Sequence, residues 1–317
     1  MPPLVCLSRP LAFPLDLPGA EIRTGPERGF ASRQDALDFV RGCDAFLSWI
    51  SERINDEFLD AAGPKLKIVA NHAVGFDNID VPACRKRNVV VTITPDAVTE
   101  GAADLAWCLL LAAARKLHAL EHFARDQTSP HGWKAFGVLG PRDFLGLDIA
   151  GKTLLIIGAG RIGYATALRS LGWGMRVLYV ARTPKPEFEF APLNARRVTL
   201  DEGLREADFI SVHTPLTPET RHLINAGNLK LCKPTAVIVN TARGPVIDEA
   251  ALAQALKANQ LWGAGLDVFE NEPTIHPDLL TLDNVVVAPH VGSATHTCRK
   301  RMADLCAANI RAVLEGR

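Results

Sequence analysis

Residues 152–157, Lys-Thr-Leu-Leu-Ile-Ile, form a mostly apolar run that leads directly into a glycine-rich segment. The segment reads Gly158-Ala159-Gly160-Arg161-Ile162-Gly163, and residues with helical spacing follow it. This G-x-G-x-x-G spacing between a strand and a helix is typical of a dinucleotide-binding turn. Its glycines allow a tight turn, a close approach of backbone amides to a pyrophosphate, and packing of the helix on the strand. The alternative is a tight turn that holds no ligand.

Short apolar runs alternate with helical patterns along the rest of the chain. Strands are predicted at residues 4–7, 45–50, 68–70, 89–93, 152–157, 176–180, 209–212, 236–239, 264–268 and 285–288. Helices are predicted at residues 34–40, 56–62, 81–87, 99–125, 164–171 and 294–314, and a loop at 127–150. The alternation predicts the α/β class, with two doubly wound parallel sheets, each covered by helices on both faces.

A chain of 317 residues has room for about two domains. The segment order predicts a Rossmann cofactor domain inserted into a flavodoxin-like substrate domain. We expect residues 1–98 and 289–317 to form the substrate (catalytic) domain and residues 99–288 to form the dinucleotide-binding domain, with the cleft between them. The last helical pattern has no strand after it, so we expect it to return to the first domain.

Charge and cysteine content favour a small-molecule partner. The 35 basic and 35 acidic residues cancel, and no long basic run is present, so neither a nucleic acid nor an anionic membrane is expected as a partner. The longest apolar run, at 105–114, is too short for a membrane span. The seven cysteines form no C-x-x-C pair, and the first residues do not read as a signal peptide, so a cytoplasmic location is expected.

His118 and His122 have the i, i+4 spacing of a metal-binding helix face. A glutamate and a third ligand at the spacing of a metalloprotease are missing, so a solvated helix face is favoured and no metal is predicted.

The strand at 176–180 ends in Ala181-Arg182-Thr183, where an acidic residue would accept a hydrogen bond from the ribose 2′-hydroxyl of NAD. Position 181 holds alanine, while the guanidinium of Arg182 and the hydroxyl of Thr183 suit a 2′-phosphate. NADP(H) is therefore the preferred cofactor. In the alternative, Arg182 is a solvated loop arginine and NAD(H) also serves.

Three polar residues, Arg243, Glu272 and His290, follow apolar runs late in the chain. Parallel sheets bind their ligands at the carboxyl ends of the strands. Reduction of a keto acid needs a proton donor, a carboxylate that holds it, and a cation for the substrate, and these residues supply that set. The carboxylate would favour the imidazolium form of the histidine. Singly, each residue also fits a structural role, as a surface arginine, a loop carboxylate or a hydrogen-bonded histidine.

The sequence resembles the D-isomer-specific 2-hydroxyacid dehydrogenases over essentially its whole length, and within them the glyoxylate/hydroxypyruvate reductase branch. The motifs that carry the resemblance are the glycine segment at 158–163, His-Thr-Pro-Leu-Thr-Pro-Glu-Thr at 213–220, Asn-Thr-Ala-Arg-Gly-Pro-Val-Ile-Asp at 240–248, Gly-Leu-Asp-Val-Phe-Glu-Asn-Glu-Pro at 265–273 and Ala-Pro-His-Val-Gly-Ser at 288–293.

The resemblance implies reduction of a small 2-keto acid, such as glyoxylate or hydroxypyruvate, to the (R)-2-hydroxy acid. It implies that His290 is the acid/base held by Glu272, and that Arg243 binds the substrate together with Trp49, Val74 and Gly75. The further cofactor contacts that it implies are His213, Pro215, Thr241, Ala242, Asp267, His290 and Gly292. It also implies a homodimer.

Three positions distinguish this sequence from particular branches or members of the family. Val74 stands where phosphite-oxidising members carry lysine, and Glu272 stands where the formate dehydrogenases pair their histidine with glutamine. Ala102 occupies a position where many relatives have a threonine that reaches the cofactor. Two alternatives stay open at this point. One is a dinucleotide-sensing, corepressor-like binding protein, and the other is a 2-ketogluconate or other D-2-hydroxyacid dehydrogenase of the same family.

Overall fold

The computed structural model describes residues 1–317, which divide by contacts into two compact units. Unit 1 comprises Met1–Val98 and Ser293–Arg317, and unit 2 comprises Thr99–Gly292. Each unit is built on one parallel sheet. None of the helices combines the length and the hydropathy that crossing a lipid bilayer requires.

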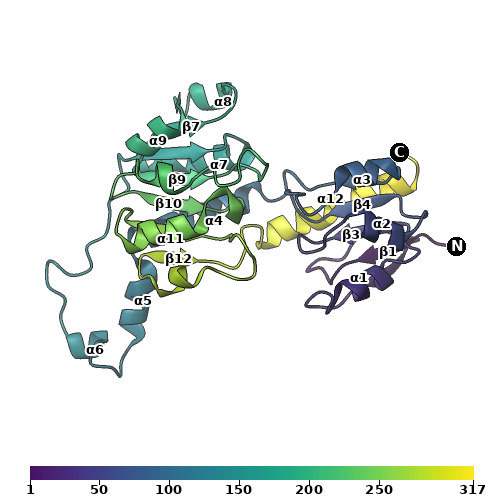
Figure 1. Ribbon diagram of the computed structural model, residues 1–317, viewed down its shortest axis with the longest axis horizontal. Coiled ribbons are helices and arrows are strands. Elements are labelled where there is room, and N and C mark those ends of the chain that lie inside the picture. Colours follow the sequence, from purple (N-terminus) through teal and green to yellow (C-terminus); the bar gives the residue numbers. More distant parts are fainter. The chain divides into compact units, whose positions relative to one another are not determined.

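Unit 1 contains a five-stranded sheet in the order β2-β1-β3-β4-β5, which is the flavodoxin-like order. Its strands are β1 (Leu4–Leu7), β2 (Glu21–Thr24), β3 (Ala45–Ser48), β4 (Ile68–Asn71) and β5 (Val90–Thr92). Its helices are α1 (Arg33–Phe39), α2 (Asp56–Ala62), α3 (Val81–Lys86) and α12 (His296–Leu314). Both chain termini lie in this unit (Figure 1).

Alternate residues of the unit 1 strands enter two different cores. Cys6, Phe46 and Val69 pack with α1, α2 and α3, whereas Leu7 and Leu47 pack with α12. Because side chains alternate between the faces of a strand, a sheet covered on both sides has strands that are buried throughout. The closing helix of the chain therefore completes the first domain's core.

Unit 2 contains a seven-stranded sheet in the order β12-β11-β10-β9-β6-β7-β8. Numbered from β6, this is the 3-2-1-4-5-6 order of dinucleotide-binding sheets with one strand added beyond it. The strands are β6 (Thr153–Ile157), β7 (Arg176–Val180), β8 (Arg196–Arg197), β9 (Phe209–Val212), β10 (Val237–Asn240), β11 (Gly263–Leu266) and β12 (Val285–Val287).

Helices cover both faces of the unit 2 sheet. One core joins the strands to α4 and α7, and the other joins them to α9, α10 and α11. The α-helices are α4 (Thr99–Ala114), α5 (Leu117–Arg125), α6 (Trp133–Phe136), α7 (Arg161–Arg169), α8 (Pro186–Glu189), α9 (Leu200–Glu206), α10 (Ala226–Leu229) and α11 (Glu249–Lys257). The 3-10 helices are η1 (Ser170–Trp173), η2 (Gly244–Val246) and η3 (Pro277–Thr281).

The single helix expected over residues 99–125 is wrong. The helix is interrupted after α4, because Lys116 adopts a left-handed conformation with φ 51°, and α5 begins at Leu117. The segment expected to be a loop at 127–150 contains the short helix α6. Helix α5 has no buried residue, and α5 and α6 extend away from the sheet of unit 2 (Figure 1).

Two short edge strands were not expected from the sequence. All four residues of β2 are exposed, and β8 consists of two exposed arginines. Neither strand shows the apolar pattern that marks a buried strand. Both pair with a neighbour along one edge only.

The second crossing between the units falls after Gly292, four residues beyond the position expected from the sequence. The backbone N–H groups of Val291 and Gly292 donate to the carboxylate of Asp267 at 2.7 and 2.8 Å. These bonds tie the segment to the end of β11, so it stays with unit 2.

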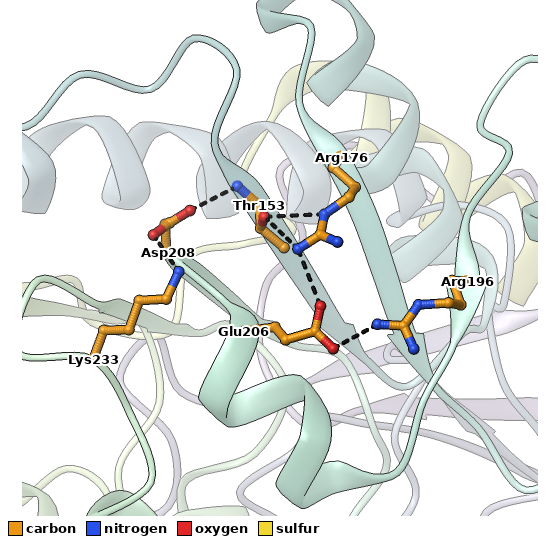
Figure 2. A network of polar contacts seen from close by, with 6 residues as sticks. All are labelled: Thr153, Arg176, Arg196, Glu206, Asp208 and Lys233. Carbon is orange, nitrogen blue, oxygen red and sulfur yellow. Dashed lines mark hydrogen bonds and ion pairs between the residues drawn. The ribbon is translucent and has the colours of Figure 1, made fainter.

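A polar network joins the amino-terminal ends of the unit 2 strands (Figure 2). Asp208, just before β9, accepts from the backbone N–H of Thr153 at 2.9 Å and from Lys233 Nζ at 2.8 Å. Arg176 Nη2, at the start of β7, donates to Thr153 Oγ1 at 3.2 Å and to Glu206 Oε2 at 3.1 Å. Each of these polar groups finds its partner within the protein.

Candidate active site

The glycine turn after β6 has the geometry that a pyrophosphate requires. Gly158 has φ 101°, and a Cβ atom there would lie 2.6 Å from the backbone of His213. A Cβ atom at Gly163 would lie 2.3 Å from the carbonyl oxygen of Gly158, whereas one at Gly160 would meet nothing within 4 Å. The first and third glycines are therefore needed for packing, and the second faces open space. Helix α7 begins next, with no side chain capping its amides.

Two buried polar atoms on the neighbouring strand ends have no partner in the protein. His213 follows β9, and its Nε2 lies 2.8 Å from Ser211 Oγ while its Nδ1 is unpaired. Burial lowers the pKa of His213 to about 3, so the ring is uncharged near neutral pH. Thr241 follows β10, and its buried Oγ1 is also unpaired. Buried polar atoms normally have partners, so this edge of the sheet fits a bound dinucleotide.

The loop after β7 holds Ala181, Arg182 and Thr183, of which Arg182 and Thr183 are exposed. Arg197 of β8 supports this loop, because its Nε donates to the carbonyl of Ala181 at 3.0 Å and its Nη2 donates to the carbonyl of Arg182 at 2.7 Å. Sequence reasoning missed Arg197, since a two-residue polar edge strand carries no pattern. Two arginines are therefore present at this site, Arg182 within the loop and Arg197 on the strand that supports it.

His290 and Glu272 form a close pair. The Nδ1 atom of His290 lies 2.7 Å from Oε2 of Glu272, and Oε1 of Glu272 accepts from the backbone N–H of Phe269 at 3.1 Å. Burial alone would raise the pKa of Glu272, but the hydrogen bond with His290 and the charges of His290 and Arg243 outweigh it and lower the pKa. Glu272 is therefore a carboxylate near neutral pH, and it fixes the orientation of the imidazole.

The backbone of His290 is held in a left-handed conformation with φ 55°. Its N–H donates to the carbonyl of Asp267 at 2.8 Å, and the side chain of Asp267 accepts from the next two backbone amides of the turn. Burial raises the pKa of Asp267, although these two bonds oppose the shift. A left-handed histidine that its surroundings hold in place is typical of functional sites.

Arg243 follows β10 in a loop that contacts the Glu272 loop. Asn240 brackets the arginine, since its Oδ1 accepts from Ala242 N at 3.0 Å and its Nδ2 donates to Arg243 O at 2.9 Å. At Gly244 a Cβ atom would lie 1.9 Å from the backbone carbon of Phe269. Only glycine allows the two loops to approach so closely.

Glu249 anchors the loop that carries Glu272, and sequence reasoning missed it. This buried carboxylate, at the start of α11, accepts from the backbone N–H groups of Glu270 at 2.6 Å and His276 at 2.7 Å. A second histidine, His222, contacts the side chain of Glu270 through Nε2. The sequence offered no signal for Glu249, because an acidic residue in the first turn of a helix is common.

The remaining predicted residues lie as follows. Pro215 follows His213, and its carbonyl accepts from Thr220 Oγ1 at 2.6 Å. In unit 1, the N–H of Trp49, directly after β3, donates to Glu52 Oε2 at 2.7 Å. Val74 and Gly75 follow β4, and Gly75 O accepts from Asn71 Nδ2 at 2.7 Å. These three unit 1 residues all lie at the carboxyl edge of their sheet.

The histidines of α5 have ring centroids 4.5 Å apart in an edge-on arrangement. No group of three or more histidine, cysteine, aspartate or glutamate side chains is placed to hold a metal ion.

A glycine turn and a His–Glu pair at the carboxyl edge of one parallel sheet define a class of protein, the nicotinamide-dependent dehydrogenases. Residues 107–292 match the family profile described as D-isomer specific 2-hydroxyacid dehydrogenase, NAD binding domain. Glyoxylate reductase from Thermococcus onnurineus is 50% identical over 297 residues, which are 93% of this chain and 87% of that protein. Glyoxylate reductase from Pyrococcus horikoshii is 50% identical over 285 residues, covering 90% and 84%.

Among solved structures, an NADPH-dependent glyoxylate/hydroxypyruvate reductase from Sinorhizobium meliloti superposes with a TM-score of 0.82 at 32% identity, covering 99% of this chain and 95% of that one. The chain therefore belongs to the D-isomer specific 2-hydroxyacid dehydrogenase family. The fold class and the family resemblance drawn from the sequence are confirmed. The protein is an oxidoreductase that uses a nicotinamide dinucleotide.

Proposed function

We propose that this protein reduces glyoxylate, hydroxypyruvate or a similar small 2-keto acid to the (R)-2-hydroxy acid. The observation that carries the proposal is the 2.7 Å pair of His290 and Glu272 on the sheet that also bears the glycine turn. The names of the relatives support the substrate class, since two are glyoxylate reductases at 50% identity and one solved structure is a glyoxylate/hydroxypyruvate reductase. A 2-ketogluconate dehydrogenase of the same family is the second candidate.

A bound dihydronicotinamide would supply the hydride that reduces the keto carbon. His290 donates a proton from Nε2 to the developing alkoxide, because its Nδ1 is engaged by Glu272. Glu272 orients the ring for this transfer through its contact with Nδ1. Arg243 binds the substrate carboxylate and polarises the keto oxygen. Trp49, Val74 and Gly75, which belong to unit 1, would complete the substrate site.

Residues of unit 2 (Thr99–Gly292) would hold the cofactor. The amides of the glycine turn, at Gly158, Ala159, Gly160, Arg161 and Ile162, would bind the pyrophosphate. His213, Pro215, Thr241, Ala242, Asp267, His290 and Gly292 would contact the rest. The unpaired His213 Nδ1 and Thr241 Oγ1 support this assignment.

NADPH is the proposed cofactor of choice. Arg182 and Thr183 would bind the 2′-phosphate, with Arg197 holding their loop, and the lack of an acidic side chain at Ala181 supports this preference. The NADPH-dependent relative at 32% identity is a further support. In the alternative, NAD(H) serves equally.

A homodimer through the α5–α6 segment is also proposed. Leu117, Trp133, Phe136, Val138 and Leu145 are between 48% and 97% exposed there, an unusual concentration of bare apolar surface. Neither α5 nor α6 has a buried residue. A second copy of the chain, covering this face, would bury it.

A cytoplasmic location stays a proposal that rests on the seven free cysteines, none of which forms a disulfide.

The test is steady-state oxidation of NADPH and, in parallel, NADH, followed by absorbance. The panel comprises glyoxylate, hydroxypyruvate, pyruvate, phenylpyruvate and 2-ketogluconate. Fast turnover of glyoxylate or hydroxypyruvate with a preference for NADPH is expected. Turnover of 2-ketogluconate alone would favour the second candidate. Binding of NADPH with no turnover of any keto acid would favour a dinucleotide-sensing binding protein.

A further inference from the structure

A buried histidine in unit 1 has no hydrogen-bond partner for its ring. His72 directly follows β4 and is 3% exposed, and neither Nδ1 nor Nε2 is paired. Its backbone is well held, since its N–H donates to Ser48 O at 3.0 Å. Buried polar atoms are normally hydrogen-bonded, so the two unpaired ring nitrogens need an explanation.

A cation with an unpaired nitrogen contacts the same tryptophan ring as this histidine. The guanidinium carbon of Arg299, on α12, is 4.7 Å from the ring centroid of Trp49, and the Trp49 and His72 ring centroids are 5.4 Å apart. Arg299 Nη1 is buried without a partner, and no carboxylate forms an ion pair with this side chain. The nearby Arg9, 5.8 Å from the Trp49 ring, differs because it pairs with Glu52 at 3.4 Å. Arg299 therefore carries the uncompensated charge.

The donor and acceptor atoms of the two side chains define what would pair with them. Burial, and then the charge of Arg299, lower the pKa of His72 to about 4, so its ring is uncharged near neutral pH and offers one N–H donor and one lone pair. Arg299 offers donors only. A hydroxyl group both accepts and donates, so it can satisfy both side chains. A carboxylate would use the donors but leave the lone pair of His72 unpaired.

The cluster lies where the substrate is proposed to bind. His72 stands two residues before Val74, which follows the same strand, and Trp49 is itself one of the proposed substrate residues. The aromatic ring of Trp49 contacts both partners, through a tilted ring pair with His72 and a cation–π contact with Arg299. These four residues, His72, Val74, Trp49 and Arg299, all belong to unit 1.

We propose that His72 and Arg299 form a subsite, on the ring of Trp49, that binds a hydroxyl group on the carbon next to the keto group of the substrate. The subsite makes 3-hydroxy-2-keto acids better substrates than 2-keto acids that lack this hydroxyl. This inference rests on the proposed function, because it assigns the substrate class of the same site.

The kinetic test compares kcat/KM for hydroxypyruvate with kcat/KM for glyoxylate. His72→Phe keeps an aromatic ring against Trp49 and removes both nitrogens, so we expect this ratio to fall by about 10-fold to 100-fold. His72→Asn restores one donor and one acceptor and should recover part of the ratio. The matched control is His296→Phe, the same substitution at an exposed residue of α12 that contacts Phe13. An unchanged ratio in His72→Phe would overturn the proposal.

A binding measurement separates this inference from the proposed function. Calorimetric titration with glycerate and with glycolate, which differ by one hydroxymethyl group, needs no turnover. The protein should bind glycerate more tightly, and His72→Phe should remove most of that difference while His296→Phe keeps it. If no keto acid is reduced but this pattern appears, the subsite stands and the proposed reaction fails. If both keto acids are reduced and His72→Phe leaves the binding difference intact, the subsite fails alone.

Discussion

Polar groups are paired at the amino-terminal edge of the unit 2 sheet, where its strands begin, and partly unpaired at the carboxyl-terminal edge, where they end. At the amino-terminal edge, Asp208 and Glu206 take up the N–H groups and cations around them, as Figure 2 shows. At the carboxyl-terminal edge, His213 and Thr241 keep unpaired buried atoms, and His290 is held at a positive φ. Both edges belong to the same strands, so the difference does not come from the fold.

The difference indicates that the amino-terminal edge stabilises the fold and that the carboxyl-terminal edge binds ligands. Polar groups that satisfy each other stabilise the folded chain, whereas unpaired or strained groups cost free energy and persist where a ligand uses them. Unit 1 repeats the pattern, with His72 unpaired at the carboxyl edge of its own sheet. Changes at the carboxyl edges should therefore alter activity, and changes at the amino edge should alter stability.

The largest effect is expected from His290→Asn. Asparagine tolerates the left-handed backbone that His290 adopts, so the turn should survive while the proton donor is lost. We expect kcat to fall by about 10³-fold or more, and NADPH binding, measured by tryptophan fluorescence, to persist. His290→Ala should lose turnover to the same extent. Full activity in both variants would reject the acid/base role.

The second effect is a dependence of stability on pH. The pKa of His213 is about 3 in the folded chain, below the ordinary value of 6.5, so the unfolded state alone binds a proton between these values. The free energy of unfolding should therefore fall as the pH is lowered below about 6.5, by about 1.4 kcal/mol per pH unit for this residue.

Urea unfolding at a series of pH values measures this slope. His213→Gln should make the slope shallower by the contribution of one histidine, and the buried His72 should account for a further part. An identical slope in wild type and His213→Gln would contradict the assignment of a neutral, buried ring.

A smaller effect is expected at the loop after β7. Arg182→Ala should raise the KM for NADPH by about 10-fold and change the KM for NADH much less, because only NADPH carries the 2′-phosphate. The matched control is Arg205→Ala, which removes an exposed arginine that pairs with Asp201 on α9. Equal effects of Arg182→Ala on both cofactors would remove this arginine from the phosphate site.

The smallest effect is expected at the opposite edge, from Asp208→Asn. The substitution weakens the bonds to the Thr153 amide and Lys233, and it should lower the free energy of unfolding by about 1 kcal/mol. Kinetic constants for keto acid and cofactor should stay within about twofold of wild type, since the proposed site residues lie at the opposite, carboxyl edge of the sheet. A large loss of kcat with unchanged stability would show that the two edges do not divide these tasks.

Much of the fold could be predicted because each sheet is covered on both faces. Strands such as β6 and β9 are buried throughout and read as continuous apolar runs. The exposed edge strands β2 and β8 carry no such run and were missed. The break before α5 was missed for another reason, since Lys116 takes a left-handed conformation without the glycine or proline that usually marks one.

The candidate site also contains residues that the sequence could indicate and residues that it could not. Arg243, Glu272 and His290 interrupt apolar strand ends, so their residue types were visible in the sequence, and their catalytic roles stay predictions. Glu249 and Arg197 act through backbone groups that are distant in sequence, and a single chain gives no sign of such bonds. The unpaired ring of His72 appears only when its neighbours are known in space.

The return of α12 to unit 1 fixes the order in which a growing chain can complete its parts. Unit 2 is one uninterrupted stretch, so all of its strands are synthesised before α12. One face of the unit 1 sheet needs Ala303, Cys306 and Ile310 of that helix to cover it. The domain whose synthesis starts first is therefore the last to close its core, and until then a nascent sheet face stays open to chaperones and to neighbouring chains.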